Sequence, residues 1–288
     1  MNITTFRQLY YTCKEKSKSI YEVALDYEAS QGEYSEYHVR LQAKKSLDAM
    51  KEAIKTGLNC TEPSPSGMSG DDCDKLQKSK ANNILGKTPQ KIMKYALATS
   101  EQNLRMGTIV ACPTAGSCGI VPAVLIAYAE DNNIKECDQI NALITAGEVG
   151  RLVANKMALA GAVGGCQAEC GVASAMAAAA LTQMRGGTVK QIINAVALAL
   201  KNILGLTCDP VCGLVEIPCV KRNPFLAIHA VTASELAMAD IISKIPIDEV
   251  VDAMEQTGQL MSPLLKESSQ GGLAKTKTAV ALEKNILK

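Results

Sequence analysis

The chain has 288 residues, a formal net charge of +1 and 47% hydrophobic residues, but only 3% of its residues are aromatic. This length supports one large domain or two modest ones, with enough chain to bury a core. A nearly neutral chain without a basic face is a poor match for nucleic acid, so we expect no nucleic-acid partner. Because Trp is absent and Phe occurs twice, the core must consist of aliphatic residues and Met, which favours closely packed helices.

The N-terminal sequence lacks the apolar run and the small-residue cleavage site of a signal peptide. Eleven cysteines in such a chain indicate cytosolic thiols rather than a disulfide framework. Residues 108–129 contain no charged side chain, but prolines and glycines interrupt them, so we interpret them as buried core plus a loop and not as a membrane span. We therefore expect a cytoplasmic protein without a membrane partner.

Apolar residues recur at helical spacing through most of the chain, which predicts helices separated by polar turns. The first two helices are expected on the surface, over 6–31 and 37–58, and a loop rich in Pro, Gly and Ser follows over 59–74. Thr88 followed by Pro89 predicts the start of the next helix. The later helices are expected at 88–106, from about 117 into a buried segment, and at 138–146, 147–159, 171–184, 189–204, 223–245 and 248–257.

Five cysteines fall within residues 161–223, in two clusters set among Gly, Pro and small residues. A free thiol used for packing behaves as a small hydrophobe, whereas thiols grouped in turns indicate a ligand that needs thiolates. Their spacings do not match the C-x2-C runs of ferredoxins or zinc ribbons. An iron–sulfur cluster is the hypothesis, and the residues alone leave open both which of the five bind it and whether all are packing thiols. The five are Cys166, Cys170, Cys208, Cys212 and Cys219.

No segment shows sustained period-two alternation, and no repeat is present. The expected fold is therefore all-α: a single helical domain over residues 1–288, whose loops rich in Cys, Gly and Pro converge on a metal-cluster site. Within it we expect residues 1–58 to form peripheral helices and residues 59–288 to form the cluster and substrate core.

Three segments carry a resemblance to a known family: PTAGSCGIVPA at 113–123, GCQAEC at 165–170 and CDPVCGLVEIPCVKRN at 208–223. They resemble the signature motifs of the iron–sulfur-dependent L-serine dehydratases, and more narrowly the α subunit of the two-subunit form. SPSGMSG at 64–70 and SSQGGLAKT at 268–276 are similar to further segments of that family.

The resemblance implies a [4Fe–4S] cluster bound by Cys166, Cys208 and Cys219. It implies packing roles for the other cysteines within the motifs, and it assigns no role to Cys13, Cys60, Cys73 and Cys137. Three protein ligands would leave one iron open as a Lewis acid on the hydroxyl of L-serine, giving pyruvate and ammonia after elimination. The packing cysteines are Cys112, Cys118, Cys170 and Cys212.

Substrate contacts are expected from loops that can offer hydroxyl and backbone N–H groups to the serine carboxylate. Each of these residues could instead be a helix cap or a tight turn, and each polar neighbour of the cysteines could be a satisfied buried group. The substrate candidates are Ser64, Ser66, Gly67, Thr114, Ala115, Gly116, Ser117, Gly271 and Gly272. The candidate supports for the cysteines are Gln167, Glu169, Asp209, Arg222 and Asn223.

The base that removes the α-proton is not identified, because His38 and His229 are both expected to be ordinary helix histidines. Single-chain members of the resembled family carry an additional preceding domain with a G-P-S-S-S-H motif, and this chain has no such motif. The resemblance therefore implies a separate β subunit.

Two alternatives stay open on the sequence. An L-cysteine desulfidase would use the same open iron with a thiolate leaving group, and an iron–sulfur scaffold or redox sensor would bind a partner without catalysis. A dehydratase that uses pyridoxal phosphate would need a glycine-rich phosphate loop in an α/β fold, which the pattern does not favour.

Overall fold

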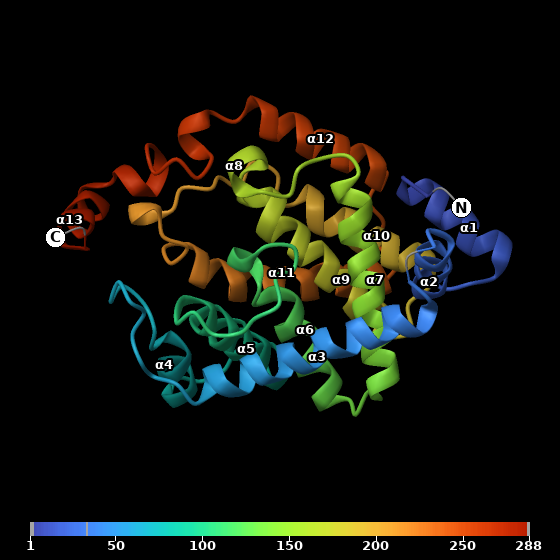
Figure 1. The fold of residues 1–288 in the computed structure, drawn as a ribbon, viewed down its shortest axis with the longest axis horizontal. Coiled ribbons are helices and arrows are strands. Elements are labelled where there is room, and N and C mark those ends of the chain that lie inside the picture. Colours follow the sequence, from blue (N-terminus) through green and yellow to red (C-terminus); the bar gives the residue numbers. More distant parts are fainter. Residues whose placement is uncertain (1–2, 33, 287–288) are drawn as a thin grey trace.

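The structure is a computed structural model that describes residues 3–32 and 34–286. Across these ranges it contains α-helices, short 3-10 turns and one π-helical turn, and no strand, which confirms the predicted all-α class (Figure 1). The helices are α1 Phe6–Lys16, α2 Ile20–Ser30, α3 Glu36–Leu58, α4 Asp72–Lys78, α5 Lys87–Leu104, α6 Ile120–Asp131, α7 Glu136–Ala154, α8 Gly161–Gly164, α9 Val172–Met184, α10 Val189–Lys201, α11 Cys219–Met238, α12 Ile247–Leu260 and α13 Lys277–Ile286.

Helix α9 lies at the centre of the bundle, and every residue from Val172 to Thr182 is buried. The helices α6, α7, α10 and α11 all pack against it (Figure 1). Six of its thirteen residues are alanines, whose short side chains let neighbouring helices approach closely at the density of a protein interior. A helix buried on all sides is what its uncharged, alanine-rich sequence predicts.

Two expected boundaries in the first half are wrong. The helix predicted over 6–31 is divided at Ser17, which adopts a left-handed backbone with φ 53°, and α2 then starts with a capping box between Ser19 and Glu22. The break predicted at Gly147 does not occur, because α7 runs continuously through this residue.

Three further predictions differ from the structure. Thr88 lies inside α5 rather than at its cap, and its hydroxyl donates to Asp131 Oδ2 at 2.6 Å, a contact between helices. Helix α11 starts at Cys219, so Pro224 lies within its second turn, and it ends at Met238 rather than near 245. Residues 277–286, for which we predicted no helix, form α13.

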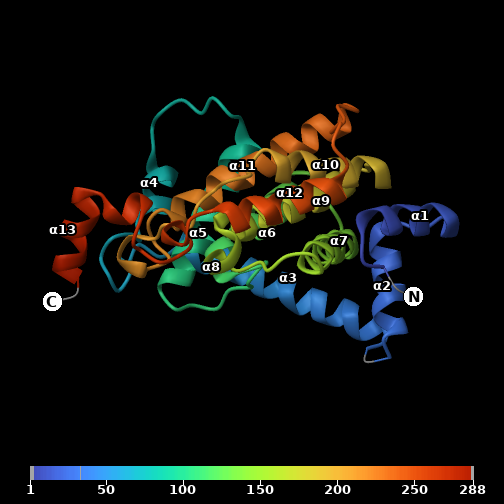
Figure 2. The same cartoon turned by 90° about the horizontal axis from the view of Figure 1, so that it is seen from above.

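The two ends of the described chain lie at opposite ends of the long axis (Figure 2). Phe6, Leu9 and Leu47 belong to the same core cluster as the alanines of α9, so the first helices contribute to the main core. The division of the chain at residue 58 remains a prediction. None of the described helices is both long enough and apolar enough to cross a membrane.

The packing around α9 makes a direct prediction. Ala177→Leu adds volume at a position with no exposed surface and should lower the free energy of unfolding by about 1–3 kcal/mol, because the four neighbouring helices cannot move apart freely. Ala29→Leu makes the same change on the exposed face of α2 and should stay within about 0.5 kcal/mol. Denaturant titration of both variants measures the difference, and equal losses would contradict a tightly packed α9.

Candidate functional site

The first cysteine motif forms a π-helical turn, Gln167–Gly171, that leads directly into α9. Cys166 is buried immediately before this turn. The side chain of Gln167 is fully buried, and its Oε1 accepts the Gly205 N–H at 2.9 Å while its Nε2 donates to the Met254 carbonyl at 2.9 Å. Gln167 therefore fixes the position of Cys166 relative to the loop after α10 and to α12.

The second motif is held by a segment near the C-terminus, residues 262–276, which we call the tail strap. The Cys208 N–H donates to the Leu265 carbonyl at 2.9 Å, and the Cys208 carbonyl accepts the Glu267 N–H at 2.6 Å. The Asp209 carboxylate accepts the Leu273 N–H at 2.8 Å through Oδ2. Backbone pairing therefore sets the position of Cys208 against a segment more than fifty residues later in the chain.

Arg222 joins the second motif to the start of α11. Its Nη2 donates to Asp209 Oδ1 at 2.9 Å, and its Nη1 donates to the Thr207 carbonyl at 2.8 Å. Asp209 is thus shared between Arg222 and the tail strap. Gly272 has a φ of 57°, and a Cβ there would lie 2.5 Å from Asp209 Oδ2, so this close approach requires glycine.

The third cysteine, Cys219, is the first residue of α11, and Asn223 lies one turn later. The buried Asn223 side chain donates through Nδ2 to the Cys219 and Gly116 carbonyls, both at 2.9 Å, and accepts the Gly119 N–H at 2.9 Å. Asn223 therefore ties the loop over 113–119 to the turn that carries Cys219.

These arrangements bring the three predicted thiols together. Burial raises the pKa of Cys219 to about 12, with the charge of Cys166 as the next cause. Burial also raises the pKa of Cys208, and the charges of Cys166 and Cys219 act in the same direction. The pKa of Cys166 is lowered, because Cys170 donates a hydrogen bond to it and the Arg222 guanidinium lies beside it. Sequence reasoning treated Cys170 only as packing, and no signal in the sequence pointed to this hydrogen bond.

Glu169 is the carboxylate next to these thiols. The Cys208 thiol contacts Glu169 Oε2 at 3.8 Å, and burial raises the pKa of Glu169. The Thr114 hydroxyl and the Gly161 N–H also bond this carboxylate. A Cβ at Gly161 would lie 2.9 Å from the Cys208 sulfur, so the backbone of α8 closes over the thiols.

The described residues include no set of three or more Cys, His, Asp or Glu side chains close enough to hold a single metal ion. A cluster with several irons separates its ligands more widely than one ion does, so this finding concerns only single-ion sites. Cys212 is half-exposed and has a φ of 58°, whereas Cys166, Cys208 and Cys219 are buried. Cys112 lies just before the 113–119 loop and Cys118 lies within it; both are buried, and burial raises the pKa of each.

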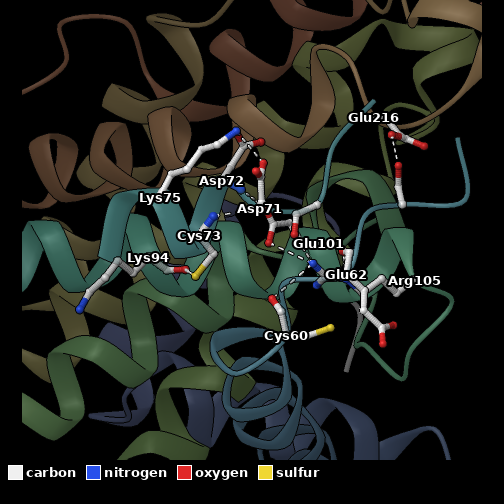
Figure 3. Close-up of polar contacts among 12 residues, drawn as sticks. Cys60, Glu62, Asp71, Asp72, Cys73, Lys75, Lys94, Glu101, Arg105 and Glu216 are labelled. Atoms are coloured by element: carbon white, nitrogen blue, oxygen red, sulfur yellow. Dashed lines mark hydrogen bonds and ion pairs between the residues drawn. The ribbon is translucent and has the colours of Figure 1, made fainter. Parts of the chain in front are cut away.

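The proposed substrate loops have different local structures. Residues 64–67 form a turn ahead of α4, not a helix start, and the Ser64 hydroxyl donates to Glu216 Oε2 at 2.8 Å (Figure 3). Ser66 accepts the Met68 N–H at 3.1 Å and stays half-exposed, as does Thr114. Ser117 is fully buried and bonds within its own loop, to the Cys112 and Thr114 carbonyls. Ala115 and Gly116 lie in that loop, while Gly67 and Gly271 each occupy a turn.

Glu216 is a site residue that sequence analysis missed. It lies inside the quoted 208–223 segment and is buried, but only its contact with Ser64 shows that it joins two motifs. The two histidines bond elsewhere: His38 Nδ1 lies 2.8 Å from Ser35 Oγ, and His229 Nε2 lies 2.9 Å from the Ala199 carbonyl oxygen.

The contact between Gly272 and Asp209 can be tested by substitution. Gly272→Ala and Gly186→Ala both place alanine at a positive φ, which costs about 1–2 kcal/mol, but only Gly272 has a neighbour that a Cβ would strike. Gly272→Ala should therefore lose at least about 1 kcal/mol more free energy of unfolding than Gly186→Ala. Denaturant titration of both variants measures this gap. Losses of the same size would show that the tail strap does not press against Asp209.

Comparison with known proteins places the chain in a family. The family model described as "Serine dehydratase alpha chain" matches residues 15–274. A Bacillus subtilis protein named "Probable L-serine dehydratase, alpha chain" is 45% identical over 97% of this chain and 94% of its own length. "L-serine dehydratase, alpha chain" of Peptoniphilus asaccharolyticus is 39% identical over 99% of both chains, and "L-serine dehydratase TdcG" of Escherichia coli is 43% identical over 62% of this chain and 40% of its own length. The chain belongs to the serine dehydratase alpha chain family.

Proposed function

We propose that this chain is the subunit of an L-serine dehydratase that eliminates water from L-serine, after which the aminoacrylate hydrolyses to pyruvate and ammonia. Family membership and the names of the relatives support the substrate and the reaction. The observation that carries the proposal is the grouping of Cys166, Cys208 and Cys219: all three are buried, the charge of Cys166 raises the pKa of both other thiols, and the charge of Cys219 raises the pKa of Cys208.

We infer a [4Fe–4S] cluster bound by these three cysteines. The donor set fits such a group, because thiolates are its ordinary ligands, the three cysteines are buried, and glycine at position 161 leaves the Cys208 sulfur uncrowded by a side chain. Binding would release the protons of Cys208 and Cys219, whose pKa values burial raises. When bound, a cluster with three protein ligands supplies an open iron as Lewis acid for the substrate hydroxyl. All eleven cysteines are free thiols, which supports a reducing compartment such as the cytoplasm.

The residues around the thiols have separate roles in this proposal. Arg222 places a positive charge beside Cys166 and offsets the negative charge of the thiolates, and Asp209 orients it. Glu169 is held beside Cys208 by Thr114 and Gly161, so it faces the position where the substrate would react.

The structure narrows the proposed substrate contacts. The Ser64 hydroxyl bonds Glu216, and the Ser117 hydroxyl bonds two carbonyls of its own loop. Both hydroxyls therefore hold the shape of their loops. Ser66 and Thr114 are half-exposed. We therefore assign the binding of the serine carboxylate to the Ser66 hydroxyl and to the backbone N–H groups of both loops, because the Thr114 hydroxyl already donates to Glu169.

We also propose a separate β subunit. The relatives are named as alpha chains, which supports a second kind of chain in their assemblies. His38 and His229 bond away from the cysteines. The base that removes the α-proton is therefore proposed to come from the partner.

The reaction itself is tested with the chain and its partner subunit, prepared without oxygen. Pyruvate should form from L-serine, should be lost after exposure to air, and should not be affected by hydroxylamine, which traps pyridoxal phosphate. Cys212→Ser should keep the activity, because Cys212 is half-exposed, unlike the three buried thiols, and none of them acts on its pKa. Release of sulfide from L-cysteine without pyruvate from L-serine would instead indicate a desulfidase.

A further inference from the structure

We infer that Arg105 is a positioning residue that holds one of the proposed substrate loops in its working shape. The loop comprises residues 60–70, includes Ser64 and Ser66, and is called the serine loop below. The inference rests on the proposed function, because that function gives the loop its role in substrate binding.

Arg105 follows the last turn of α5, and its guanidinium contacts both ends of the serine loop (Figure 3). Its Nε donates to the Glu62 carbonyl at 2.7 Å. Its Nη2 donates to the Cys60 carbonyl at 3.4 Å and also to the Gly70 carbonyl. The side chain is only 9% exposed. One planar cation thus fixes three backbone carbonyls, a geometry that the single nitrogen of a lysine cannot reproduce.

Glu101 completes the arrangement from one turn earlier in α5. Its carboxylate has no exposed surface and lies 3.5 Å from Arg105 Nη2. Oε1 accepts the Asp72 N–H at 2.7 Å and the Cys73 N–H at 3.2 Å, at the start of α4. A carboxylate is favoured at a helix N-terminus. The pair therefore holds the serine loop and the helix that follows it to the same turn of α5.

The base of the loop is closed tightly. A Cβ at Gly70 would lie 2.6 Å from the Glu62 carbonyl oxygen, so the two ends of the loop meet at van der Waals distance. Within the loop, the Ser64 N–H donates to the Ser69 carbonyl at 2.7 Å and the Gly67 N–H donates to the Ser64 carbonyl at 2.9 Å. The shape of the turn around Ser66 thus depends on its closed base.

The loop and α4 are also connected to the segment that flanks Cys219. Ser64 donates to Glu216, Lys221 forms an ion pair with Asp72 at 2.6 Å, and Cys73 packs in one apolar cluster with Val220. A change in the position of the loop base would therefore move Ser66 relative to the third cysteine. Arg105 acts on the substrate through the loop and does not need to touch it.

The test uses the chain with its partner subunit and its iron. Arg105→Lys keeps the charge but loses the planar guanidinium that bonds three carbonyls. Arg185→Lys is the matched control, because Arg185 bonds Ser234 and Glu235 in a helix pair away from the site. We expect Arg105→Lys to lower kcat/KM for L-serine about tenfold to a hundredfold, mainly by raising KM, since a displacement of about 1 Å has effects of this size. Iron content and the absorption spectrum should not change.

Hydrogen exchange supplies a readout that does not depend on activity. The amides of Ser64 and Gly67 should exchange faster in Arg105→Lys than in the wild type or in Arg185→Lys. Glu101→Gln keeps an acceptor for the amides of α4 and should speed the exchange of the Ser64 and Gly67 amides less strongly. This variant replaces Arg105→Lys in the test if Arg105→Lys does not fold. Unchanged exchange, unchanged kcat/KM, or a loss of iron in parallel with activity would each overturn the inference. A wild-type complex that does not dehydrate L-serine would overturn the proposed function instead.

Discussion

The burial of α9 from Val172 to Thr182 is the constraint on which the rest of the structure depends. Its alanines let α6, α7, α10 and α11 approach closely, and the π-helical turn at its N-terminus carries the first cysteine motif. The loop before α6, the loop after α10 and the first residue of α11 carry the other motif residues. The π-helical turn at Gln167–Gly171 packs against α10, α11 and the short 3-10 helix before α6. The packing of one small-residue helix therefore brings segments distant in sequence to one place.

Packing alone does not orient the loops, because loops lack the regular hydrogen bonds of a helix. Single buried polar side chains supply this orientation: Gln167 joins three segments, Asn223 joins two, and Asp209 joins Arg222 to the tail strap. Each of these buried side chains bonds at least two partners, and such buried polar contacts favour one arrangement of the loops. The site is rigid for this reason, and the role of these residues is to place the thiols rather than to react.

The sequence predicted α9, α10 and α12 closely, α9 from its uncharged, alanine-rich composition and α10 from an apolar stripe that its neighbours bury. Two residues predicted to start helices do not. Thr88 lies inside α5 and bonds a second helix, and Pro224 lies inside α11. The grouping of the cysteines in turns was visible in the sequence. The contacts of Arg105 were not, because an arginine in a helix shows nothing of the carbonyls that a distant loop brings to it.

The central claim is that three cysteines of this chain bind an iron–sulfur cluster. Anaerobic iron and sulfide analysis with an absorption spectrum tests it most directly, on the wild type and on four single variants. About four irons per chain are expected in the wild type and in Cys212→Ser, and their loss is expected in Cys166→Ser, Cys208→Ser and Cys219→Ser. Absence of iron from protein prepared without oxygen, or equal loss in Cys212→Ser, would contradict the account.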